Sequence, residues 1–275
     1  MADDAASLPI RPLSSVADLR AVEALQREVW GFDDVEVVPL HVLMTAARHG
    51  GVVLGAFDGG TLAGFSFAFR GSDPDGTSVL CSHLLAVAPA ARGRGLGVAL
   101  KWAQREAALA QGVARVVWTF DPLEHGNARL NLNRLGGVSD RYLVDLYGEL
   151  RDELNAGLPT DRIEVVWELT SPRVRAAAER RARAETDPGP LLDPGAPEGE
   201  VRDPEGAPAV RLAALRDVQA LRRRDVDAAR AWRLHVRAAL TSLFDRGYLL
   251  VGAGEGAAGA ELRLAHRDAD PLGVG

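Results

Sequence analysis

The sequence lacks the features that tie a protein to a membrane, to nucleic acid or to an oxidising compartment. Its single cysteine, Cys81, excludes an internal disulfide and fits a reducing compartment. The formal net charge of -6 argues against nucleic acid or an anionic membrane as a partner. Every apolar run is shorter than the ~20 residues of a membrane span. The chain begins Met1-Ala2-Asp3-Asp4 without a basic and apolar signal segment, so we expect a cytoplasmic protein without a membrane partner.

The composition is that of an ordinary globular protein. Hydrophobic residues make up 47% of the chain and charged residues 25%. A length of 275 residues allows one large domain or two smaller ones.

The most informative stretch runs from Val79 to Gly112. Its apolar start predicts a buried strand up to Val87, and a proline turn then leads into a basic, glycine-spaced loop. That loop opens a helix, whose first backbone N–H groups have no partner within the helix and lie at the positive end of its dipole. Arg92 and Arg94 add full positive charges, so phosphate is the ligand that we expect. The loop has neither the Walker A pattern nor the dinucleotide Gly-x-Gly-x-x-Gly pattern.

This loop resembles the signature of the GNAT superfamily of acyl-CoA-dependent N-acyltransferases, Gln/Arg-x-x-Gly-x-Gly/Ala between a strand and a helix. Arg92, Gly95 and Gly97 occupy the signature positions, after Val87-Ala88-Pro89. The resemblance implies that acetyl-CoA or another acyl-CoA is the co-substrate and that loop amides hold its pyrophosphate. A glycine-rich turn with surface arginines is the competing interpretation. The residues predicted to bind the coenzyme here are Arg92, Gly93, Arg94, Gly95, Leu96, Gly97 and Val98.

The elements expected around this loop follow the order of the GNAT fold. Periodicity and turn residues predict β-α-α-β-β-β-α-β-α-β-β over about residues 8–170. We therefore expect an α/β fold with a mixed central sheet flanked by helices, and a smaller C-terminal α+β extension. The predicted domains are 1–170, the acyltransferase; 171–208, a helix and a Pro/Gly-rich linker; and 209–275, the extension. The extension is expected to pack on the catalytic domain or to form part of a homodimer contact.

The chemistry of amine acylation requires a base for the amine, a polarised thioester carbonyl and neutralisation of the thiolate. The resemblance implies that a backbone N–H of the central strand, at Leu85, Ala86 or Val87, holds the carbonyl where neighbouring strands splay apart. The tyrosine that often serves as the acid in the family aligns here with Leu132, so that group is absent.

Two residues are the candidates to take over the proton transfers. His83 precedes Leu85 by two residues, so strand alternation predicts that both face the same side, where an imidazole could accept the amine proton. A hydrogen-bonded structural histidine is the alternative. Tyr147, like Tyr142, could donate to the thiolate or could simply pack in its strand.

The segment after the predicted strand 115–120 carries the other polar candidates. Asp121 and Glu124 could hold a cationic amine, act as a base or form a solvated turn. Asn127 and Asn131 are candidates for coenzyme binding, because asparagine in a helix interior suggests a side-chain partner. Capping of the helix by Asn127 is the competing interpretation.

The function predicted from the sequence is transfer of an acetyl or succinyl group from CoA directly to a primary amine of a small molecule. One alternative is a CoA-binding regulatory module without efficient catalysis. Another is a nucleic-acid-associated protein that uses the arginines of the helix around residues 226–243, against which the net charge argues. For Arg230, Arg233 and Arg237 a solvated helix face is the favoured interpretation.

Overall fold

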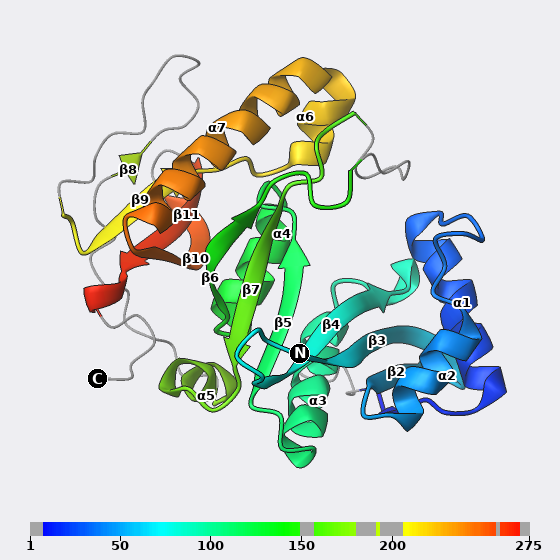
Figure 1. The fold of residues 1–275 in the computed structure, drawn as a ribbon. Helices are drawn as coiled ribbons and strands as arrows, with labels where there is room; N and C mark the ends of the chain where they lie inside the picture. The colour runs from blue at the N-terminus through cyan, green and yellow to red at the C-terminus, as the bar shows by residue number, and fades with distance from the viewer. Residues whose placement is uncertain (1–7, 149–156, 180–190, 193–205, 257–258, 270–275) are drawn as a thin grey trace, which may run out of the picture. The chain divides into compact units, whose positions relative to one another are not determined.

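The computed structural model describes residues 8–148, 157–179, 191–192, 206–256 and 259–269 (Figure 1). The chain forms two compact units, and the boundary between them falls after Trp118. The domain boundaries at 170 and 208 stay predictions, and most of the Pro/Gly-rich segment 186–208 lies outside the described residues.

The first unit begins with a short strand and two helices, β1 (Ile10–Pro12), α1 (Val16–Trp30) and α2 (Leu40–Arg48). Ser15 caps α1, because its Oγ accepts a hydrogen bond from the Asp18 N–H at 3.1 Å. Gly31 ends that helix in the left-handed conformation, at φ 67°.

The sheet of the first unit has the strand order β1-β2-β3-β4-β5. Neighbouring strands are antiparallel except β4 and β5, which are parallel. β2 (Val52–Asp58) and β3 (Thr61–Ser72) form the expected hairpin through Gly59 and Gly60. β4 (Ser78–Val87) leads through a 3₁₀ turn, η1 (Pro89–Ala91), to α3 (Leu96–Ala110) and then to β5 (Arg115–Phe120).

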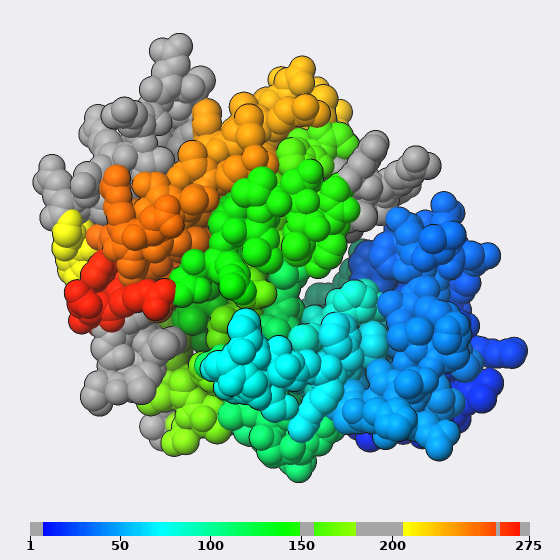
Figure 2. Space-filling model, viewed as in Figure 1, coloured from blue at the N-terminus to red at the C-terminus, as the bar shows by residue number. Residues whose placement is uncertain are grey.

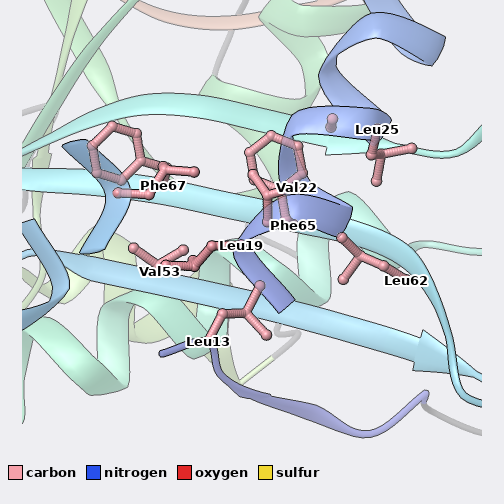
Figure 3. Packing of buried hydrophobic residues seen from close by; sticks show 10 residues of the cluster. Leu13, Leu19, Val22, Leu25, Val53, Leu62, Phe65 and Phe67 are labelled. Carbon is pink, nitrogen blue, oxygen red and sulfur yellow. The ribbon is translucent and has the colours of Figure 1, made fainter. Parts of the chain in front are cut away.

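Both faces of this sheet are covered. On one face, Phe65 and Phe67 of β3 pack against apolar residues of α1 (Figure 3). On the other, a Cβ placed on Gly64 would lie 3.2 Å from Leu96 and 3.3 Å from Leu100 of α3. The sheet therefore separates an α1/α2 face from an α3 face. The buried cluster on the α1/α2 face consists of Leu13, Leu19, Val22, Leu25, Leu43, Val53, Leu62, Phe65, Phe67 and Ala86.

The second unit continues with α4 (His125–Ala128), a π-helical turn η2 (Arg129–Arg134), β6 (Val138–Leu143), β7 (Arg162–Glu168) and α5 (Pro172–Ala178). With these elements the predicted order is confirmed through β7, and so is the α/β fold class. Trp167 of β7 is fully buried, and its Nε1–H donates to the Leu135 carbonyl at 2.7 Å.

The C-terminal part contains β8 (Leu191–Leu192), β9 (Ala209–Ala213), α6 (Val218–Arg224), α7 (Val226–Asp245), β10 (Tyr248–Gly256), β11 (Gly259–His266) and a 3₁₀ turn η3 (Arg267–Ala269). The strands of the second unit lie in the order β7-β6-β10-β11-β9-β8, so the extension continues the sheet that β6 and β7 begin. The periodicity of α7 predicted its buried stripe, while its other face reaches the surface (orange in Figure 2). None of the helices in the described ranges is long and apolar enough to cross a membrane.

Candidate acyl-CoA site

The loop between η1 and α3 provides an open anion-binding geometry. Gly93 and Gly95 have φ of 78° and 74°, in the left-handed region that favours glycine. Gly95 is the N-cap of α3, and no side chain caps this helix end. The first N–H groups of α3 are therefore left to a ligand or to solvent. In this respect the loop has the form expected from the sequence.

The two arginines of the loop differ in their partners. Arg92 is exposed, and its Nε donates to the Val87 carbonyl at 3.3 Å. Arg94 forms an ion pair with Asp58 at 3.0 Å, and both side chains are exposed. An exposed ion pair contributes only about 0–1 kcal/mol, so Arg94 can exchange this partner for a bound anion.

The strand before the loop has one edge that is only partly paired. β4 pairs with β3 as far as Val87, opposite Gly64. With β5 its ladder ends earlier, at the pair Cys81 and Val117. Within the first unit, the backbone of Leu85, Ala86 and Val87 is thus available on the β5 side. Leu85 and Val87 face α3, because a Cβ on Gly97 would lie 3.8 Å and 3.9 Å from them.

The expectation that His83 faces the same side as Leu85 is wrong. Phe67 and Ala68 of β3 pair with Leu84 and Ser82, which leaves His83 as the extra residue of a β-bulge. Its ring lies 5.9 Å from each of the rings of Phe67 and Phe69, in edge-to-face contact. The bulge breaks the alternation, so His83 lies on the α1/α2 face. Desolvation lowers the pKa of His83, although the residue as a whole is exposed at the surface.

A buried lysine on α3 is the polar residue of this unit that sequence reasoning missed. Lys101 is only 3% exposed. Its Nζ donates to Ser82 Oγ at 2.7 Å and to Gln104 Oε1 at 3.3 Å. The same ammonium lies 3.6 Å from the centroid of the Trp118 ring. Burial lowers the pKa of Lys101 to about 7.

The remaining predicted site residues belong to the second unit. Asn127 is exposed in α4, and its side chain does not cap that helix, which begins after Glu124. Asn131 is buried in η2. Their coenzyme contacts stay predictions. The asparagine with a clear structural partner is Asn133, whose amide exchanges hydrogen bonds with the backbone of Ala253 in β10 at 2.7 and 3.0 Å.

The tyrosines of this unit differ in their surroundings. Tyr147 is 51% exposed, and its hydroxyl lies 3.0 Å from Thr119 Oγ1. The Tyr142 hydroxyl donates to Asp161 at 2.7 Å, and burial together with that carboxylate raises its pKa. Leu132, which stands where the family often has a tyrosine, is fully buried.

The two carboxylates after β5 also have different partners. Arg233 of α7 binds Asp121 through two hydrogen bonds of 2.6 Å, and the two side chains are 2% and 13% exposed. The interpretation of this arginine as part of a solvated face is therefore wrong. Glu124 accepts a 2.7 Å hydrogen bond from Gln219 of α6, and burial raises its pKa.

Arg237 of the same helix pairs with Asp161 through two hydrogen bonds of 2.8 Å. The third arginine, Arg230, is exposed and donates to the Gly157 carbonyl at 2.8 Å. Two of the three arginines of α7 thus pair with carboxylates of the second unit, and Arg230 is the exposed one of the three.

Comparison with known proteins identifies one family. Residues 18–136 match the model of the acetyltransferase (GNAT) family. No curated protein matches the chain. Similar solved structures include an N-acetyltransferase from Staphylococcus aureus, at 16% identity and TM-score 0.47, covering 59% of this chain and 98% of that one. The ribosomal-protein-S18-alanine N-acetyltransferase from Escherichia coli has 16% identity and TM-score 0.44, covering 58% and 93%. Aminoglycoside 6'-acetyltransferase type Ii has 15% identity and TM-score 0.46, covering 59% and 97%.

Proposed function

We propose that the protein transfers an acyl group from acyl-CoA to a primary amine of a small molecule, starting from the match of residues 18–136 to the model of the GNAT acetyltransferase family. The family is one of acyl-CoA-dependent N-acetyltransferases. The observation that carries the proposal is the uncapped start of α3 at Gly95, next to a strand whose β5 edge is unpaired past Cys81.

The coenzyme would be held by the loop and by β4. The N–H groups of Leu96, Gly97 and Val98 lie at the positive end of α3 and suit the pyrophosphate, with Arg92 and Arg94 adding charge. A backbone N–H among Leu85, Ala86 and Val87 suits the thioester carbonyl, because their β5 edge is free within the first unit.

His83 is the proposed base for the amine. Its lowered pKa keeps the imidazole neutral at pH 7, which is the form that accepts a proton. The amine nitrogen would attack the carbonyl carbon directly, the C–S bond would break, and its electron pair would leave with the sulfur. Tyr147 remains the sequence-based candidate for donating a proton to that sulfur.

In the second unit, Glu124 stays the sequence-based candidate for holding a cationic amine. Asp121 is neutralised by Arg233, whereas Glu124 accepts a hydrogen bond only from the neutral Gln219 among the described residues. A small-molecule amine fits this single carboxylate, and the acyl group is acetyl or succinyl.

The experiment that tests the proposal is calorimetric titration with acetyl-CoA, succinyl-CoA and free CoA. We expect the protein to bind them and Gly95→Glu to abolish binding, because the new carboxylate lies where the pyrophosphate should bind. Gly76→Glu is the matched control, since Gly76 also has a positive φ of 85° and open space around it. Unchanged affinity of Gly95→Glu would refute the proposed coenzyme site.

Measuring turnover distinguishes the proposed transferase from a regulatory CoA-binding module. Binding with a preference among acyl groups, followed by acylation in a screen of small amines, supports the transferase. Binding without turnover of any amine or peptide would favour a regulatory CoA-binding module.

A further inference from the structure

Lys101 is the only lysine of the chain, which also contains 31 arginines. The two residue types are not equivalent when buried, because a lysine can release its proton whereas an arginine stays charged. A sequence that uses arginine for every other basic position has its one lysine at a site that is 3% exposed. Counting lysines and arginines in the sequence would therefore have drawn attention to Lys101.

Among the described residues, the contacts of the Lys101 ammonium are all with uncharged groups. Its contacts are the Ser82 hydroxyl, the Gln104 amide carbonyl and the Trp118 ring, none of which titrates. In the part of the chain that the structure describes, no carboxylate forms an ion pair with it. Buried charges in proteins are normally paired, because leaving water costs several kcal/mol per ion. Within the described ranges, Lys101 is therefore a buried basic group that has no carboxylate to balance its charge.

The position of Lys101 relates it to the coenzyme site. Ser82 and Trp118 are the residues that directly follow Cys81 and Val117, the last pair of the β4–β5 ladder. The ammonium contacts both of them, so it lies where the two strands stop pairing. On α3 it follows Leu96 by five residues, a rise of about 7.5 Å from the helix start.

We propose that Lys101 supplies the positive charge that stabilises the coenzyme's thiolate when the thioester breaks. This inference rests on the proposed acyl transfer and names the group that acts at its leaving atom. When the C–S bond breaks, its electron pair stays on sulfur as the thiolate. A proton passing from Nζ to sulfur then gives the thiol and a neutral amine, and the proton released by the acylated amine restores the ammonium through solvent.

Two observations favour Lys101 over a tyrosine in this role. By the resemblance drawn from the sequence, Leu132 stands at the position of the family's usual tyrosine, and it is fully buried. Tyr147 is half exposed, whereas the buried ammonium acts in a low dielectric, where its attraction for an anion is several times stronger than in water. The lowered pKa of Lys101, about 7, also makes proton release easy near neutrality.

The test uses the fact that Lys101 is the only lysine. Protein labelled with ¹³C at the lysine ε-carbon gives a single lysine signal, whose shift can be titrated against pH without any assay of turnover. The probes are free CoA and desulfo-CoA, which lacks the sulfur. We expect Lys101 to stay protonated to a pH at least about one unit higher with CoA than with desulfo-CoA, a tenfold or larger shift of its proton equilibrium. Identical titrations with both probes would overturn the proposal.

A second measurement follows the ionisation of the CoA thiol, which is the proposed partner of the Lys101 ammonium. The ultraviolet absorbance of the thiolate should show that the thiol of bound CoA ionises at lower pH in the wild type than in Lys101→Met, an unbranched replacement that is one atom shorter and uncharged. Gln104→Leu is the matched control, because it removes a neighbouring polar contact and keeps the ammonium. An unchanged thiol titration in a folded Lys101→Met that still binds desulfo-CoA would contradict the role. Absence of CoA binding in the wild type would overturn the proposed function, and with it this inference.

Discussion

At the scale of single residues, the bulge at His83 decides which side of the sheet receives the proposed base. One extra residue in β4 shifts the side chain from the face of Leu85 to that of Phe67 and Phe69. A bulge is set by the register of two strands, so strand alternation in the sequence could not indicate it. The sequence nonetheless indicated this residue as a candidate, from its type and its place before the segment that is proposed to bind the carbonyl.

Replacing His83 with alanine should lower kcat by about a hundredfold or more while leaving the affinity for acetyl-CoA nearly unchanged. In the wild type, kcat/KM should fall as the pH drops through the His83 pKa, which burial holds below its usual value, because protonated imidazole cannot accept the amine proton. That acidic limb should disappear in the variant. The measurement is the pH dependence of steady-state kinetics.

His49→Ala is the matched control, since His49 is an exposed histidine at the end of α2. It should leave both the rate and the pH profile unchanged. A rate loss of less than about threefold in His83→Ala would assign His83 a structural role.

At the scale of elements, α7 is held to the second unit by buried ion pairs as well as by its apolar stripe. Asp121 and Arg233 are 112 positions apart in the sequence. The helical pattern placed the arginines on one helix, but it contained no information about carboxylates so distant in the chain. For that reason, the interpretation of Arg233 as part of a solvated helix face was wrong.

Replacing Arg233 with alanine should destabilise the protein by about 3 kcal/mol, because the largely buried Asp121 carboxylate loses its two short hydrogen bonds and keeps only Arg162 at 3.9 Å. The measurement is the free energy of unfolding in urea. The double variant Asp121→Asn with Arg233→Met should recover a large part of that loss, since neither charge then remains buried. Arg230→Ala, on the exposed side of the helix, should change stability by no more than about 0.5 kcal/mol. Equal effects of Arg233→Ala and Arg230→Ala would show that the buried pair does not stabilise the fold.

At the scale of the whole molecule, the extension is part of the second unit rather than an appended segment. β10 pairs with β6 through Leu250 and Ser139, and α7 supplies the partners of Asp121 and Asp161. The sequence predicted that the segment packs, since α7 has a clear apolar stripe. The strand β11 and the helix α6 were not predicted.

Removing residues 209–275 should therefore yield a chain that aggregates or unfolds at lower temperature. The truncation removes a strand that neighbours β6. It also leaves Asp161 without Arg237, and Asp121 with only Arg162 at 3.9 Å as an ion-pair partner. Soluble yield, size-exclusion chromatography and thermal unfolding against the full chain measure the effect. A truncated chain that stays soluble, monodisperse and equally stable would refute it.

The sequence by itself determined the order of the elements through β7, the anion-binding loop and the family resemblance. These features depend on local signals, namely apolar periodicity, capping and turn residues, and the spacing of Arg92, Gly95 and Gly97. Only the tertiary structure decided the face of His83, the partner of Arg233 and the burial of Lys101 among uncharged groups of the described residues. Strand register and contacts across long stretches of chain set all three, because burial and pairing depend on which distant residues the fold brings together.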